Sequence, residues 1–176
     1  IPARVDWNLF FHSIPNGRWG MIEGWIRHSF PGFELDFSWK MTQAEVLVLY
    51  GASGAGKTTV LRVIAGLVKP KAGQILIDDL VVHDIDKRIW VPPQNRKIGY
   101  VPQINNVFPH LTVEQNVSYG VNNDQKDRVS SLLRSFDLES LKQRRPQNLS
   151  GGERQRTAIA MALAPLPKLL LFDEPF

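Results

Sequence analysis

A glycine-rich stretch with the letters GASGAGKT runs from Gly51 to Thr58 and fits the pattern G-x-x-x-x-G-K-[ST]. Glycines let such a loop curl until successive N–H groups point at phosphate oxygens, and the helix that follows adds partial positive charge. Lys57 would reach the β- and γ-phosphates of a nucleotide, and the Thr58 hydroxyl would hold Mg²⁺. The alternative is a glycine-rich turn with a surface lysine. We predict a nucleotide site made by Gly51, Ala52, Ser53, Gly54, Ala55, Gly56, Lys57, Thr58 and Thr59.

Two acids, Asp173 and Glu174, end an apolar run near the end of the sequence. Residues 168–174, KLLLFDE, are typical of a central parallel strand, and ligands bind at the C-terminal edge of such a sheet. We expect Asp173 to bind Mg²⁺ through water and Glu174 to be the general base that polarises the attacking water. The alternative for two such acids is a solvated strand end or a helix cap. Their pairing with the glycine loop favours the catalytic interpretation.

The stretch LSGGERQR, residues 149–156, places two glycines where a helix begins. Glycine costs a helix about 1 kcal/mol relative to alanine. Ser150 and Glu153 fit a capping box, so a plain capped helix start is one interpretation. It does not explain Gly151 and Gly152, which leave the N–H groups of the first turn uncovered beside a serine hydroxyl. Because uncovered amides bind anions, Ser150, Gly151 and Gly152 are candidates for a second phosphate-binding helix end.

Strands and helices must hold these residues, and the hydrophobic pattern predicts them. Residues 33–39 alternate between apolar and polar side chains as a half-exposed strand does, and residues 45–51, EVLVLYG, read as a buried strand. Residues 74–82 predict a strand or hairpin, and residues 96–103 a short strand. The glycine loop precedes an amphipathic helix that carries Val60, Leu61 and Ile64. Strand, loop and helix in this order are what a phosphate site needs.

The middle of the sequence has the pattern of helices. Thr112 and Gln115 have the spacing of a capping box. Residues 126–136 place four apolar side chains on one helical face, Val129, Leu132, Leu133 and Phe136. A further helix begins at Ser150, and Pro165 must end it. We therefore expect a helical region between two α/β halves.

The composition of the chain is that of an ordinary globular domain, with 176 residues, 43% hydrophobic and 22% charged. The net charge is +4, and Lys and Arg are scattered apart from short clusters such as residues 142–145. We therefore favour a solvated, mildly basic surface, and expect no nucleic acid partner. The absence of cysteine excludes a disulfide framework or a zinc knuckle. No apolar run approaches the roughly 18 residues that cross a bilayer.

Four motifs in this order, GASGAGKTT, VPQ, LSGGERQR and LLLFDEP, resemble the nucleotide-binding subunit of ATP-binding cassette (ABC) transporters across residues 21–176. The third motif, the family's signature, distinguishes it from GTPases, kinases and other P-loop proteins. The resemblance implies ATP and Mg²⁺ as cofactors and head-to-tail pairing of two copies. In that pair, the Ser150 helix of one copy closes on the γ-phosphate of the ATP that Lys57 of the other copy holds.

Further positions acquire roles through this resemblance. Gln103 matches the family's glutamine that contacts Mg²⁺ or the attacking water. It is therefore a catalytic candidate together with Lys57 and Glu174. It is also a candidate metal ligand together with Thr58 and Asp173.

In this family, an aromatic residue upstream of the first core strand usually stacks on adenine. Phe30 is our candidate, His28 is nearly as well placed, and a buried core aromatic is the alternative for Phe30. Residues 107–117 resemble the region that receives a coupling helix from the membrane subunit.

The resemblance implies an α/β fold, with a P-loop NTPase core, a mostly parallel sheet and an inserted helical subdomain. We expect residues 1–20 to be an upstream linker, 21–104 the first part of the core, 105–149 the helical subdomain, and 150–176 the signature helix and Walker B strand. The family's switch histidine and last core strands would lie beyond Phe176. We therefore expect a fold that is incomplete at the C-terminus, and a fragment that is inactive as an ATPase by itself.

The predicted function is to couple ATP hydrolysis to import, at the cytoplasmic face of the membrane, together with transmembrane permease subunits and indirectly a substrate-binding protein. The sequence looks most like bacterial importers of oxyanions, with the molybdate type first and sulfate or ferric-ion relatives next. The alternative is a soluble ABC-type ATPase that acts on ribosomes or DNA. A third interpretation is a nucleotide-binding regulator without turnover, which would need Glu174 or Lys57 to be dispensable.

Overall fold

The computed structural model describes residues 21–30, 33–42, 45–104, 107–121 and 126–173 of the chain. The chain divides between Ile98 and Gly99 into two compact units. We name the described residues up to 98 the sheet unit and those from 99 onward the helical unit. Each unit has buried apolar side chains of its own.

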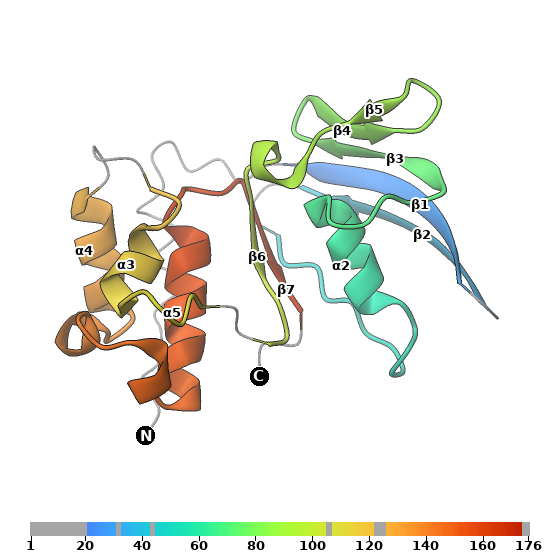
Figure 1. The fold of residues 1–176 in the computed structure, drawn as a ribbon. Helices are drawn as coiled ribbons and strands as arrows, with labels where there is room; N and C mark the ends of the chain where they lie inside the picture. Colours follow the sequence, from blue (N-terminus) through green and yellow to red (C-terminus); the bar gives the residue numbers. More distant parts are fainter. Residues whose placement is uncertain (1–20, 31–32, 43–44, 105–106, 122–125, 174–176) are drawn as a thin grey trace. The chain divides into compact units, whose positions relative to one another are not determined.

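The sheet unit contains a five-stranded sheet with the strand order β2-β1-β3-β4-β5, in which every neighbouring pair is antiparallel (Figure 1). Its strands are β1 (Ile22–Phe30), β2 (Phe33–Met41), β3 (Ala72–Ile77), β4 (Leu80–Asp84) and β5 (Ile89–Trp90). Helix α2 (Lys57–Ala65) lies between β2 and β3 in the sequence, and a short 3-10 turn, η1 (Pro93–Asn95), follows β5. The predicted strand at 33–39 and the hairpin at 74–82 are confirmed.

Alternating side chains give this sheet one buried face. In β1, Ile22 and Ile26 are buried, whereas Trp25 and Arg27 are exposed, as the two-residue period of a strand requires. The buried face of β3 continues the pattern, and α2 adds Val60, Val63 and Ile64 to the buried set of the unit. The chain therefore positions α2, and the glycine loop at its start, within a unit that has its own core.

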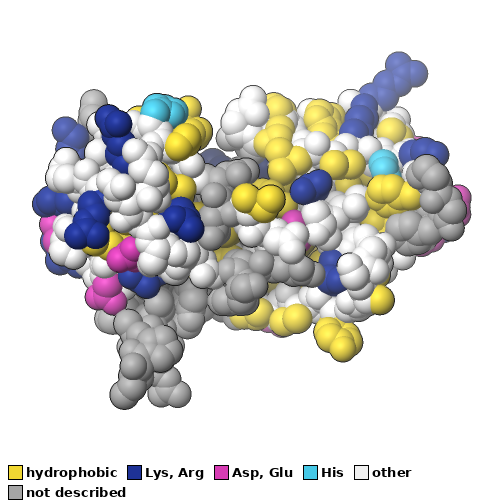
Figure 2. Space-filling model, turned by 60° about the horizontal axis from the view of Figure 1, so that its bottom comes forward, with side chains coloured by type: hydrophobic (Ala, Val, Ile, Leu, Met, Phe, Trp, Pro, Cys, Tyr) yellow, Lys and Arg dark blue, Asp and Glu magenta, His cyan; other side chains and the backbone are white. Residues whose placement is uncertain are grey.

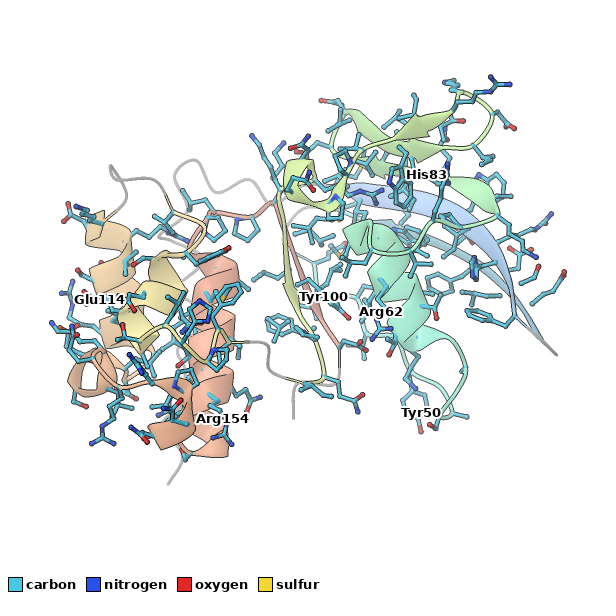
Figure 3. The ribbon with its side chains drawn as sticks, viewed as in Figure 1. Tyr50, Arg62, His83, Tyr100, Glu114 and Arg154 are labelled. Carbon is cyan, nitrogen blue, oxygen red and sulfur yellow. The ribbon has the colours of Figure 1, made fainter. Side chains whose placement is uncertain are left out.

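The predicted buried strand at residues 45–51 is wrong. This segment is not a strand, and its side chains other than that of the half-buried Leu49 are exposed, with Val46 at 84%, Val48 at 75% and Tyr50 at 99% of full exposure. Figure 3 shows Tyr50 ahead of α2. A strand exists only where a neighbour pairs with its N–H and C=O groups, and none of the described ladders includes residues 45–51. The prediction of a mostly parallel sheet is likewise not confirmed, because the five-stranded sheet is antiparallel.

The helical unit holds the helices α3 (Val113–Ser118), α4 (Lys126–Ser135) and α5 (Gly151–Leu163), and the 3-10 turns η3 (Glu139–Leu141) and η4 (Pro146–Asn148). Its two-stranded sheet pairs β6 (Ile98–Val101), which starts at the boundary of the units, with β7 (Leu169–Phe172). The four apolar side chains predicted on one face of residues 126–136 are all buried in its core. The predicted helices are thus confirmed, and α5 ends before Pro165.

His83 in β4 is fully buried, and its ring stands edge-on to Trp90 at 5.4 Å between centroids (Figure 3). Burial lowers the pKa of His83 below its ordinary 6.5. The unfolded chain therefore binds a proton that the folded chain does not, so the free energy of unfolding should fall as the pH drops below 6.5. His83→Gln should reduce the difference between the free energies of unfolding measured by urea titration at pH 7.5 and at pH 5.5. His110→Gln, which changes an exposed histidine, should leave this difference as in wild type. The same difference in both variants would contradict the assignment of the pH dependence to His83.

Candidate functional site

The glycine loop before α2 has the backbone that a phosphate loop requires. Gly54 and Gly56 have φ angles of 81° and 88°, in the left-handed region that glycine enters without strain. Gly56 is the N-cap of α2, and its carbonyl accepts the first helical hydrogen bond, from Val60 N–H at 2.9 Å. Residues 51–55 are exposed. The curl of the loop and the start of α2 thus depend on glycines at two positions whose backbone conformation other residues rarely adopt.

Lys57 is the first residue of α2, and its side chain turns back over the loop. Its Nζ donates to the carbonyl oxygens of Gly51 at 2.9 Å and Ala52 at 3.0 Å. The first turn of α2 also carries Thr58 and Thr59 but no acid, and its N-cap, Gly56, has no side chain that could cap it, whereas α3, α4 and α5 each have an acid in the first turn. The N-terminal partial charge of α2 is therefore not compensated by an acid in its own first turn, which favours an external anion.

The signature helix, α5, begins with a complete capping box. Glu153 N–H donates to Ser150 Oγ at 3.3 Å, and Ser150 N–H donates to the Glu153 carboxylate at 2.6 Å. This second bond lowers the pKa of Glu153. The capped-helix interpretation is therefore confirmed, but it leaves the glycines to be explained.

Gly151 and Gly152 are exposed, and neither has a positive φ angle. A Cβ atom added at Gly151 would meet no described atom within 4 Å, and one at Gly152 would meet only Arg156 Nη1, at 3.8 Å. Within the part of the chain that is described, then, neither backbone strain nor crowding calls for glycine. Close approach of another molecule would call for it, so Ser150, Gly151 and Gly152 stay candidates for binding phosphate.

The ends of β6 and β7 bring Asp173 beside the strand that leads to Gln103. Asp173 N–H donates to the Val101 carbonyl at 3.0 Å, so the C-terminal ends of the two strands meet, as in a parallel pair. Asp173 is 3% exposed, and Tyr100 Oη donates to its carboxylate at 2.9 Å (Figure 3). Tyr100 was not among the predicted site residues; its position in the predicted strand at 96–103 was the available signal. Gln103 is exposed, two residues beyond β6.

The other predicted site residues divide between the units and the undescribed part of the chain. Lys57 and Thr58 belong to the sheet unit, and Gln103, Ser150 and Asp173 to the helical unit. Glu174 lies outside the described residues.

In β1, Phe30 is half-buried, and its ring contacts that of His28 at 4.8 Å between centroids. Both adenine candidates therefore lie together at the same end of one strand.

The predicted metal ligands are a hydroxyl, an amide and a carboxylate, on Thr58, Gln103 and Asp173. All three supply oxygen, the donor that Mg²⁺ prefers, and so fit that ion chemically. The described ranges contain no group of three or more His, Cys, Asp or Glu side chains that could hold a metal. None of the helices described combines the length and the apolar character of a membrane-spanning segment.

Comparison with known proteins gives a consistent set of relatives. The profile of the family described as "ABC transporter" matches residues 35–176. The chain is 45% identical to "Molybdenum import ATP-binding protein ModC" of Photorhabdus laumondii, over 74% of this chain and 37% of that protein. It is 42% identical to "Fe(3+) ions import ATP-binding protein FbpC" of Haemophilus influenzae, over 80% of this chain and 41% of that protein. The chain thus spans about two fifths of the length of these curated relatives.

A crystal structure of a nucleotide-free ATP-binding cassette from an ABC transporter has a similar fold, with a TM-score of 0.75. The similarity covers 89% of this chain and 70% of that one, at 21% sequence identity. At this identity the likeness establishes the α/β cassette fold alone.

Proposed function

Because the chain belongs to the ABC transporter family, we propose that it binds and hydrolyses ATP as the energy-coupling subunit of an importer. The observation that carries this proposal is the start of α2, where two left-handed glycines, a lysine over the loop and an acid-free first turn lie together; such a helix start favours an anion. A triphosphate is the anion that this loop accommodates, since a row of N–H groups and one ammonium can bind several phosphate oxygens.

In the proposed mechanism, Lys57 and the loop amides hold the β- and γ-phosphates. Mg²⁺, when bound by Thr58, Gln103 and Asp173, would neutralise charge on the phosphates. Tyr100 fixes the direction of the Asp173 carboxylate through its hydrogen bond. Glu174 would orient the attacking water and accept its proton.

A second copy of the chain completes the proposed site. Ser150, Gly151 and Gly152 would direct their amides and hydroxyl at the γ-phosphate of the ATP held by Lys57 of the other copy. Among the described residues, no atom lies within 4 Å of a Cβ added at Gly151, which supports this role because a closely approaching phosphate needs that space. Permease subunits would bind the pair at the cytoplasmic face of the membrane, and a substrate-binding protein would act through them.

We propose molybdate or a related anion as the transported substrate. Both ModC and FbpC proteins are similar to the chain, at 45% and 42% identity, so the names alone leave an oxyanion and a ferric ion as candidates. Uptake assays with the complete transporter should show accumulation of molybdate that depends on ATP. Accumulation of iron without molybdate would contradict this choice of substrate and leave the ATPase proposal intact.

Ser150 and Thr112 provide a matched test of the two-copy site, because each caps a helix with the same pair of hydrogen bonds. Ser150→Ala and Thr112→Ala should each cost about 1 kcal/mol of folding free energy. Only Ser150→Ala should also lower ATP hydrolysis by the full-length protein, by about tenfold to a hundredfold, since it removes a hydrogen bond to a charged phosphate. Equal ATPase rates in the two variants would overturn the phosphate role of Ser150.

A further inference from the structure

Arg96, just after η1, is a buried cation that is held by main-chain carbonyl oxygens. The residue is 1% exposed, and the bonds described for it go to Val91 O at 2.8 Å, Val63 O at 3.0 Å, Ile64 O at 2.8 Å and Val82 O at 3.4 Å. Its guanidinium lies over the Trp90 ring, 4.6 Å from the centroid. Burial lowers the pKa of Arg96 to about 10, so the side chain is still charged at neutral pH.

Two of these carbonyls, on Val63 and Ile64, belong to the last turn of α2. The last four carbonyls of a helix lack helical partners and carry its partial negative charge, which a cation stabilises. Gly66, which follows α2, has a φ angle of 82°, and an added Cβ there would lie 2.6 Å from Arg96 Nε. The end of α2 is therefore shaped around Arg96.

Arg128 in α4 makes the same kind of contact with α5. Its Nε donates to Ala164 O at 3.2 Å, and its Nη2 donates to Leu163 O at 3.0 Å. Leu163 is the last residue of α5, and Ala164 is its C-cap. The side chain is partly buried, which lowers the pKa of Arg128. Two arginines from distant parts of the sequence thus bind the C-terminal ends of the two helices whose N-termini carry the candidate phosphate sites.

We propose that Arg96 and Arg128 are positioning residues for these two helix starts. Each guanidinium fixes one helix at its C-terminal end, so that the amides at the other end keep their direction, and it offsets the negative end of the helix dipole. The inference rests on the proposed function, because it assigns separate steps to the two helices: Arg96 serves the chain's own ATP site, and Arg128 serves the site in the second copy.

Because the two helices serve different steps, the two arginines should affect different constants, the Kd for ATP and kcat. A role in stability alone would not separate these two constants. We expect Arg96→Met in the full-length protein to raise the Kd for ATP by about tenfold, with kcat at saturating ATP nearly unchanged. Arg128→Met should leave the Kd of the isolated subunit within about twofold of wild type and lower kcat by about tenfold. Lysine at either position should bring the affected constant part of the way back to its wild-type value, because lysine keeps the charge of arginine but not its planar fork of donors. Arg27→Met, which removes an exposed ion pair with Asp36, is the control that should change neither constant.

Titration of each variant with ATP, followed by steady-state ATPase assays, separates the outcomes. A raised Kd with unchanged kcat in Arg96→Met, together with an unchanged Kd and a lowered kcat in Arg128→Met, supports the proposal. Parallel changes in both constants, or wild-type constants in both variants, overturn it. Failure of both Arg96 variants to fold also overturns it, because the arginine would then hold the unit together rather than position the loop. Wild-type protein that binds no ATP overturns the proposed function itself, whereas a wild-type Kd for ATP in Arg96→Met overturns only this inference.

Discussion

Lys57→Ala should weaken ATP binding by the full-length protein by about a hundredfold or more. The substitution removes a positive charge that lies over the loop, within 3.0 Å of two of its carbonyls, where the phosphates are expected. Charge-assisted hydrogen bonds to phosphate are among the strongest that a side chain makes. Because the loop carbonyls are exposed, water replaces the lost donor, and the thermal stability of the protein without nucleotide should hardly change.

Titration with a fluorescent ATP analogue, beside a melting curve, measures both expectations for Lys57. Lys40→Ala removes an exposed lysine that pairs with Glu23 in the same unit, and serves as the control for lost charge. Unchanged ATP affinity in Lys57→Ala would refute the phosphate loop.

Glu174→Gln should leave ATP binding intact and lower hydrolysis by about 10² to 10⁴, the usual contribution of a general base. Glutamine has the shape of glutamate but cannot accept the proton of the attacking water. ATP should then persist between the two copies, so that the paired form accumulates in size-exclusion chromatography.

Single-turnover assays give the rate of hydrolysis directly. Glu139→Gln changes an exposed acid that pairs with Lys142 and is the matched control. A Glu174→Gln protein with the wild-type rate would show that another group is the base, and would leave the ATP-binding proposal untouched.

The sequence predicted the structure best where neighbouring residues decide it. The spacing of Thr112 and Gln115, and of Ser150 and Glu153, predicted two capping boxes, and both form. A cap depends on residues within a single turn, so the identities of those residues are sufficient to predict it. The apolar face of residues 126–136 was predicted for the same reason, since an amphipathic helix needs only some apolar surface to cover it.

The failures concern partners that are distant in the sequence. Apolar composition alone predicted a buried strand at residues 45–51, but a strand needs a neighbour, and none of the described ladders pairs with this segment. On the face drawn in Figure 2, hydrophobic side chains lie at the surface, and lysines and arginines are spread across it rather than gathered. The scattered charge agrees with the sequence, whereas the exposed apolar side chains of Val46, Leu47, Val48 and Tyr50 do not.

The sequence by itself determined the candidate chemistry of this protein, because each motif is a short run whose residue types fix a loop, a cap or a charged tip. Only the tertiary structure decided that Arg96 would be buried against carbonyls 32 and 33 positions earlier in the chain, and that Tyr100 would donate to Asp173, 73 positions later. Such contacts depend on how strands and helices pack. Local spacing carries no record of that packing, so a buried arginine and a surface arginine look the same in the sequence.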